Sequence, residues 1–151
     1  MKIRIEINDG IQEDEVIIRC RELTASVAEI QKAVADKVSS VPKMVFFKEK
    51  DEYYFPLALV LFFETDGEIV YAHTAGDTFR TEFKLYELQQ ILPAKFVRIS
   101  RSAIVNTAHI LSISRNLTSA SLIRFHKSHK QVYVSRMYYK ELKERLNQRS
   151  I

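Results

Sequence analysis

Residues 96–106 read Phe96-Val97-Arg98-Ile99-Ser100-Arg101-Ser102-Ala103-Ile104-Val105-Asn106 and form the most informative part of the chain. Apolar and polar residues alternate from Phe96 to Ser100, which is the period of a strand with one buried face. Arg98 lies in this strand and Arg101 at its exit, so the two arginines cannot both face inward. The stretch therefore predicts a strand with at least one exposed basic side chain near its end.

On both sides of this stretch, short segments rich in β-branched and aromatic residues are separated by turn signals such as Asp66-Gly67 and Gly76-Asp77. The predicted strands are 45–48, 53–55, 59–64, 69–74, 78–83, 96–100, 110–114, 121–126 and 131–134. Two helices accompany them, one over 85–92 that stops at Pro93 and one that begins after Ser135 as its N-cap. The pattern predicts a mainly β fold with short helices.

The first 43 residues predict a separate strand–strand–helix module. Ile3, Ile5 and Ile7 alternate with charged residues, and 15–20 reads as a second strand. Ser26 and Glu29 form a capping-box pattern for a helix with an apolar stripe at 27, 30, 34 and 38. Pro42 marks the boundary, so we expect an association or signal-input module over 1–43 and a second domain over 44–151.

Charge is distributed unevenly along the chain. Residues 1–94 carry 11 Lys and Arg against 17 Asp and Glu, whereas residues 95–151 carry 12 against 2, and the net charge is +4. A basic end of this kind favours a polyanionic partner, either nucleic acid or an acidic surface. The alternative is that the basic end folds back onto the acidic one.

Enzymatic and cofactor-dependent functions lack sequence support. The chain has one cysteine, Cys20, and three isolated glycines, so disulfides, cysteine-rich zinc sites and glycine-rich phosphate loops are excluded. His126 and His129 have metal-ligand spacing but lie beside Lys127 and Lys130, which would repel a cation. We expect no enzyme activity, no metal and no cofactor.

The stretch 96–106 resembles the hallmark of LytTR-type DNA-binding domains, F-x-R-x-H-R-S-x-x-V-N. Six of its seven fixed positions match, at Phe96, Arg98, Arg101, Ser102, Val105 and Asn106, and Ser100 stands where the family has histidine. The segment LVLFFETD over 59–66, the helix over 85–92 and the closing V-S-R-M-Y over 134–138 are similar to further family features. In the closing motif Met137 replaces an arginine. The resemblance covers about residues 44–148.

The resemblance implies a mostly antiparallel β fold that inserts loops into the major groove of double-stranded DNA. The residues expected at the DNA are Arg98, Arg101, Ser102, Ser135, Arg136, Met137 and, more weakly, Glu68. Arginine suits guanine or phosphate, and serine suits phosphate oxygens. Two alternatives stay open: Arg98 forms a salt bridge with an acidic neighbour such as Glu64, and Asn106 ties its own turn.

We therefore expect a cytoplasmic, sequence-specific transcriptional regulator. About 43 residues precede the DNA-binding domain, too few for the receiver domain that relatives usually carry, so we expect no control by aspartyl phosphorylation. The apolar stripe at 27, 30, 34 and 38 suggests a homodimer on DNA, and the resemblance implies an inhibitory membrane protein as a further partner. The rival interpretation is a non-enzymatic interaction module whose basic half binds an acidic protein or a membrane surface. RNA binding is a third, without an aromatic RNP signature.

Overall fold

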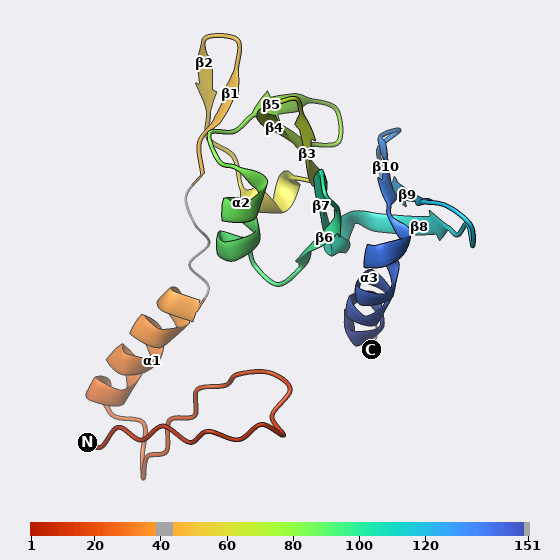
Figure 1. Ribbon diagram of the computed structural model, residues 1–151. Helices are drawn as coiled ribbons and strands as arrows, with labels where there is room; N and C mark the ends of the chain where they lie inside the picture. Colours follow the sequence, from red (N-terminus) through yellow and green to blue (C-terminus); the bar gives the residue numbers. More distant parts are fainter. Residues whose placement is uncertain (39–43, 150–151) are drawn as a thin grey trace. The chain divides into compact units, whose positions relative to one another are not determined.

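The computed structural model describes residues 1–38 and 44–149, and the chain divides into two compact units, residues 1–40 and 41–151 (Figure 1). In the first unit, helix α1 spans Ala25–Val38. Its start is capped by Thr24, whose Oγ1 accepts from the Val27 amide at 3.3 Å and whose carbonyl accepts from the Ala28 amide at 2.9 Å. The predicted helix is confirmed, but Thr24 takes the capping role expected of Ser26.

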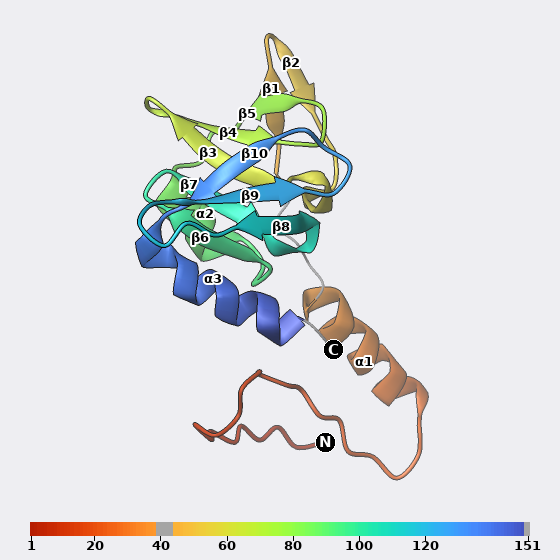
Figure 2. The same ribbon diagram turned by 90° about the vertical axis from the view of Figure 1, so that its right-hand side faces the viewer.

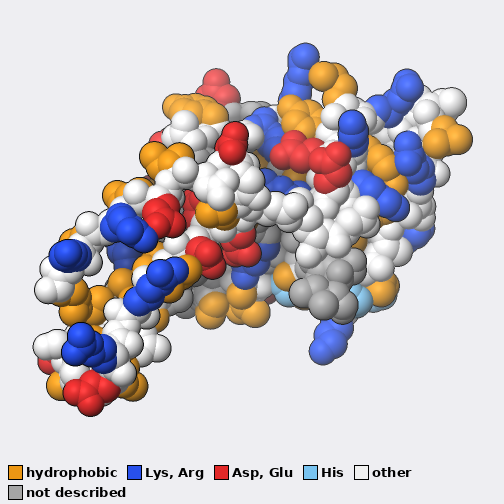
Figure 3. Space-filling model, turned by 90° about the horizontal axis from the view of Figure 1, so that it is seen from below, with side chains coloured by type: hydrophobic (Ala, Val, Ile, Leu, Met, Phe, Trp, Pro, Cys, Tyr) orange, Lys and Arg blue, Asp and Glu red, His pale blue; other side chains and the backbone are white. Residues whose placement is uncertain are grey.

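The two strands predicted before this helix are not formed in the described residues 1–38. The side chains of Ile3, Ile5 and Ile7 are 95%, 83% and 94% exposed. An alternating pattern becomes a strand only where a neighbour completes the hydrogen-bond ladder and a core covers the apolar face, and this unit supplies neither. The space-filling view shows hydrophobic side chains reaching the surface between charged ones (Figure 3).

A seven-stranded antiparallel sheet forms the centre of the second unit, with strand order β2-β1-β5-β4-β3-β7-β6. Its strands are β1 Phe46–Lys48, β2 Asp51–Tyr53, β3 Phe62–Asp66, β4 Ile69–His73, β5 Thr78–Arg80, β6 Phe96–Ser100 and β7 Ala103–Asn106. A 3₁₀ turn over Leu57–Leu59 precedes β3, and helix α2 spans Leu85–Ile91.

A second antiparallel sheet has the order β10-β9-β8 and lies across the larger sheet (Figure 2). It consists of β8 Ile110–Ser114, β9 Ser121–Phe125 and β10 Gln131–Val134, and a 3₁₀ turn over Thr107–His109 leads into it. Helix α3, Arg136–Arg149, follows β10 and packs along β6. The mainly antiparallel β fold with short helices is thus confirmed.

Two hydrophobic cores lie on opposite faces of the large sheet. Phe63 and Ile104 point into the core shared with α2, whereas their neighbours Phe62 and Val105 point into the core shared with the small sheet and α3. Because successive side chains of a strand point to opposite faces, the same strands contribute residues to both cores. Because both faces are covered, β7 is buried at every position and shows no alternating pattern, and the sequence did not predict it.

Candidate nucleic-acid interface

The two sequence segments expected at the DNA lie next to each other. One is the turn between β6 and β7, which carries Arg101 and Ser102, and the other is the start of α3, which carries Ser135, Arg136 and Met137. The Ser135 amide donates to the Ile99 carbonyl at 2.8 Å, so the last residue before α3 is fixed to β6. Residues 34 positions apart in the sequence thus form one surface.

Arg101 and Arg136 are the exposed cations of this surface. In residues 1–38 and 44–149, neither guanidinium has a hydrogen-bond or ion-pair partner. Each therefore keeps its five N–H donors for a ligand. Met137 beside them is 88% exposed, so its apolar side chain is accessible from solvent.

Arg98 has a different environment from Arg101. Its Nε donates to the Ser100 carbonyl at 2.6 Å, its Nη2 to the Arg101 carbonyl at 2.5 Å and its Nη1 to Gln89 Oε1 at 3.0 Å. The guanidinium thus holds the β6–β7 turn to α2. Glu64, considered above as its salt-bridge partner, is not among these contacts, and burial followed by the charge of Asp66 raises the pKa of its carboxyl.

Ser100, the departure from the family motif, helps to shape the same turn. Its Oγ accepts from the Ser102 amide at 3.1 Å and lies 3.2 Å from Ser102 Oγ. The Ser102 carbonyl in turn accepts from the Thr65 amide at 2.8 Å, which links the turn to the end of β3. A register shift between Arg98 and Ser100 marks a β-bulge, which changes the direction of the side chains that follow it.

Glu68 lies at the tip of the β3–β4 hairpin, which has a two-residue turn between the paired residues Asp66 and Ile69. Gly67 has φ of 63°, a left-handed conformation that glycine adopts without strain. Glu68 is exposed, and its carbonyl accepts from Lys84 Nζ at 3.3 Å. Its carboxylate is therefore accessible, but it belongs to a second loop next to the β6–β7 turn.

Asn106 is a structural residue, as its alternative interpretation predicts. It is completely buried, its Nδ2 donates to the Val60 carbonyl at 3.0 Å and its Oδ1 accepts from the Ala108 amide at 3.0 Å. These bonds join the 3₁₀ turn after β7 to the segment before β3. A buried amide with both ends paired is not available to DNA.

Lys130 and Lys127 both lie in the basic segment that the sequence indicates as a hairpin tip. In the structure, Lys130 links the small sheet to the large one. Its Nζ donates to Thr78 Oγ1 at 3.1 Å, contacts the Asp77 carbonyl and lies 3.3 Å from His73 Nδ1. Burial, and next the charge of Lys130, lower the pKa of His73 to about 4. Lys127, by contrast, is exposed at the hairpin tip.

Other site chemistries find no support in the part of the chain that the structure describes. In residues 1–38 and 44–149, no three His, Cys, Asp or Glu side chains converge as a metal site requires. Over the same residues, no helix combines the length and the apolar character needed to cross a bilayer.

Known proteins resemble this chain in sequence and in overall fold. The sequence profile of the LytTr DNA-binding domain matches residues 50–147. An uncharacterized HTH-type transcriptional regulator of Staphylococcus aureus strain NCTC 8325 is 33% identical over 148 residues, which are 97% of this chain and 99% of the relative. Its counterpart in strain MRSA252 is 32% identical over the same length. A solved LytTr DNA-binding domain from Bacillus cereus has a TM-score of 0.62 and 27% identity, over 69% of this chain and 96% of that one.

The mainly antiparallel β fold and the matched sequence profile define the class of this protein, a DNA-binding domain built on β-sheets. The chain belongs to the LytTr DNA-binding domain family. The name of the staphylococcal relatives includes "HTH-type", yet the α-helices described in this chain are separated by strands, and no two are joined by a short turn.

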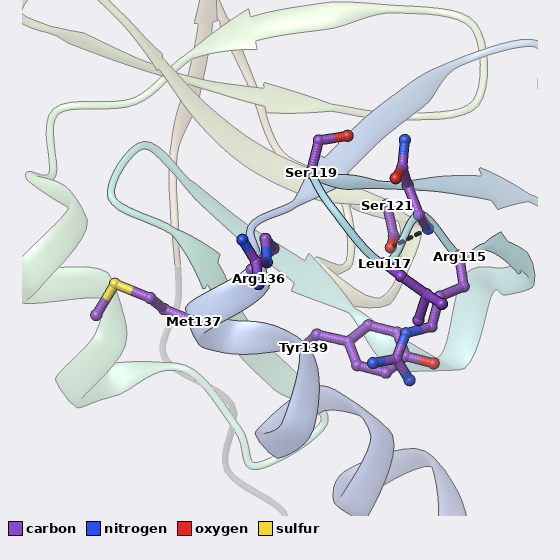
Figure 4. Close-up of a pocket in the computed structure, with 8 residues that line it drawn as sticks. Arg115, Leu117, Ser119, Ser121, Arg136, Met137 and Tyr139 are labelled. Carbon is purple, nitrogen blue, oxygen red and sulfur yellow. Dashed lines mark hydrogen bonds between the residues drawn. The ribbon is translucent and has the colours of Figure 1, made fainter.

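One group of residues on this surface was missed by sequence reasoning. The β8–β9 loop carries Arg115, which lies over the ring of Tyr139 in α3 with 3.9 Å between its Cζ and the ring centroid (Figure 4). The two residues are 24 positions apart and belong to no motif, so only the fold brings them together.

Proposed function

We propose that this member of the family regulates transcription by binding specific sites in double-stranded DNA, with the β6–β7 turn and the start of α3 entering the major groove. The single observation that carries the proposal is the pair of exposed guanidiniums of Arg101 and Arg136, on adjacent elements and without a partner among residues 1–38 and 44–149. Arginine is the best bidentate partner of guanine N7 and O6. Met137 supplies an apolar surface that suits a thymine methyl group.

The supporting residues have distinct roles in this proposal. Ser102 and Ser135 are half-buried beside the two arginines and suit phosphate oxygens, which fix the register of a protein on DNA without reading sequence. Arg98 acts through the turn that it holds. We propose Glu68 as an acceptor for a cytosine amino group, the one base contact that suits a carboxylate, and its exposure in the β3–β4 turn supports this.

A selection from a random duplex library with the full chain tests the proposal. We expect enrichment of a common sequence, and a loss of about 1–3 kcal/mol on that duplex for Arg101→Ala or Arg136→Ala, with a smaller loss on a scrambled duplex. Lys50→Ala, in the exposed β1–β2 turn, is the matched control for loss of one charge.

Equal losses on both duplexes for both arginine variants would make Arg101 and Arg136 phosphate contacts and refute base reading. Absence of any enriched sequence, with binding to acidic proteins or anionic vesicles instead, would favour the interaction-module alternative.

We also propose that residues 1–43 mediate protein association, either with a second copy of the chain on DNA or with an inhibitory membrane protein. The exposed side chains of Ile3, Ile5 and Ile7 support this, because apolar surface of that extent is usually covered by a partner. A unit of about 40 residues also seldom has a sufficient core of its own. Sedimentation velocity of the wild-type full chain, compared with that of a variant in which Ile3, Ile5 and Ile7 are all replaced by Ser, tests self-association.

The remaining parts of the proposal concern cellular context. We propose that the protein acts in the cytoplasm, where bacterial DNA lies, and that it performs no catalytic step and needs no cofactor. Its action on a gene would then follow from where it binds and from which proteins it contacts.

A further inference from the structure

A hollow of about 540 Å³ lies between the β8–β9 loop and the start of α3. Its walls come from residues 115–121 on one side and from Arg136, Met137 and Tyr139 on the other. The family motifs cover the α3 side of this hollow but not the β8–β9 loop. The hollow therefore adjoins the start of α3, which we propose to lie at the DNA. Its other wall consists of β8–β9 loop residues that have no role in the proposed function.

The β8–β9 loop is held in a defined shape by its own side chains. The Asn116 amide donates to Ser121 Oγ at 3.0 Å, and Ser121 is only 3% exposed (Figure 4). Asn116 Oδ1 accepts from both the amide and the hydroxyl of Thr118, at 3.1 and 3.0 Å. The backbone that carries Arg115 is thus fixed before any ligand arrives.

Arg115 is also held at its far end. Its guanidinium lies over the Tyr139 ring, an arrangement in which the positive charge meets the negative face of the ring. Stacking uses the flat face of the guanidinium and leaves its N–H edge available. That edge has no hydrogen-bond or ion-pair partner in residues 1–38 and 44–149, and Arg115 is exposed, so a ligand can reach it.

The charge of the hollow favours an anion. Arg115 and Arg136 both line it, and no acidic residue does. The only acidic residues after position 94 are Glu141 and Glu144, further along α3. The oriented guanidinium of Arg115 suits the bidentate binding of a phosphate group, and Arg136 adds a second positive charge beside it.

We propose that this hollow receives a DNA backbone phosphate that flanks the bases facing Arg136 and Met137. The inference rests on the proposed function, since it takes the start of α3 to lie at the groove. Arg115 is then a positioning contact that is independent of sequence, and Tyr139 acts through Arg115 by holding its guanidinium ready.

Salt-dependent binding separates this role from base reading. The probes are the duplex enriched by selection and a scrambled duplex of the same length. Arg115→Ala should weaken both by the same factor and should lower the slope of log affinity against log salt by about 0.9, the value for one phosphate contact. Tyr139→Leu should weaken both several-fold with little change in slope, because the charge stays while its orientation is lost. Tyr139→Phe should bind as the wild type does.

Arg124→Ala is the matched control, because Arg124 is an exposed arginine on neighbouring β9 whose Nη1 bonds Ser114 Oγ at 2.9 Å. Thermal unfolding establishes that each variant folds. An Arg115→Ala variant that matches Arg124→Ala, or that loses affinity on the selected duplex alone, would overturn this inference and leave the proposed function intact. A wild-type chain that binds neither duplex would overturn both.

Discussion

Arg98→Met is the substitution that best tests how the interface is built. It keeps the length and the aliphatic part of the side chain and removes three hydrogen bonds, to the carbonyls of Ser100 and Arg101 and to Gln89. A hydrogen bond from a charged donor contributes about 1.5–3 kcal/mol when buried, and less when exposed. Because Arg98 is half-buried, we expect a total loss of about 2 kcal/mol in the free energy of unfolding. For a unit of this size that lowers the Tm by roughly 8 °C.

The same substitution should weaken DNA binding in a recognisable way. Arg101 would no longer be held by a fixed turn, so binding would have to order it, at a cost of about 0.5–1.5 kcal/mol. The salt slope should stay unchanged, since no phosphate contact is lost. Arg101→Met is the control with the same change of charge. It should leave the Tm unchanged, because its guanidinium has no partner in the described chain, and it should lose discrimination between selected and scrambled duplexes.

Thermal unfolding followed by circular dichroism and fluorescence-anisotropy titration at two salt concentrations measure both effects. An Arg98→Met chain with wild-type Tm and a salt slope reduced by about one would refute the reasoning, because Arg98 would then contact a phosphate directly.

Three further outcomes follow from the geometry. Asn106→Ala should cost about 1–3 kcal/mol of stability, since the Val60 carbonyl and the Ala108 amide lose their buried partner; a denaturant midpoint equal to the wild type would contradict this. Gly67→Ala should lower stability by about 1 kcal/mol through its left-handed φ alone, because a Cβ there would meet no atom within 4 Å; a rise in Tm would argue against it. The unfolded chain protonates His73 near its ordinary pKa of 6.5, whereas the folded chain does so only near 4, so stability should fall as pH decreases through that window. His73→Gln should remove about 1–2 kcal/mol of this decrease, and identical stability–pH curves for the two proteins would exclude His73 as its source.

The sequence predicted the fold class well because most strands of the second unit have one covered face or clear turns. Its errors have physical causes. Residues 103–106 are covered on both faces, so β7 has no alternation to detect. Residues 3–7 alternate perfectly but have no ladder partner in the described part of their unit, so the pattern produced no strand. An alternating pattern of apolar and polar residues shows which side chains prefer water. Whether the backbone pairs with another strand depends on tertiary contacts.

The site shows the same limit at the level of single residues. The sequence placed Arg98 and Arg101 together as candidate DNA contacts, and nothing in their residue type separates them. The bulge between Arg98 and Ser100 and the nearness of Gln89 in α2 direct one guanidinium onto the protein's own carbonyls and leave the other in solvent. These contacts are close in sequence, at separations of two, three and nine residues, but they form only because of the bulge and the packing of α2, which residue type does not encode. Lys130 is determined by long-range contacts instead, since its partners at 73, 77 and 78 lie in β4, in the β4–β5 turn and in β5 of the large sheet.

Electrostatic charge alone is therefore a poor guide to which cations of this chain meet DNA. Arg98 and Lys130 are basic and lie in the basic half, yet the protein's own backbone carbonyls already receive their N–H groups. A cation whose donors are already satisfied would have to break those bonds to reach a base or a phosphate, and the cost would offset the gain. Arg101, Arg115 and Arg136 have no hydrogen-bond or ion-pair partner in the described part of the chain and face no such cost there, and Arg115 is in addition oriented by an aromatic ring. The unsatisfied donors, rather than the basic residues as a whole, define the surface that DNA should contact.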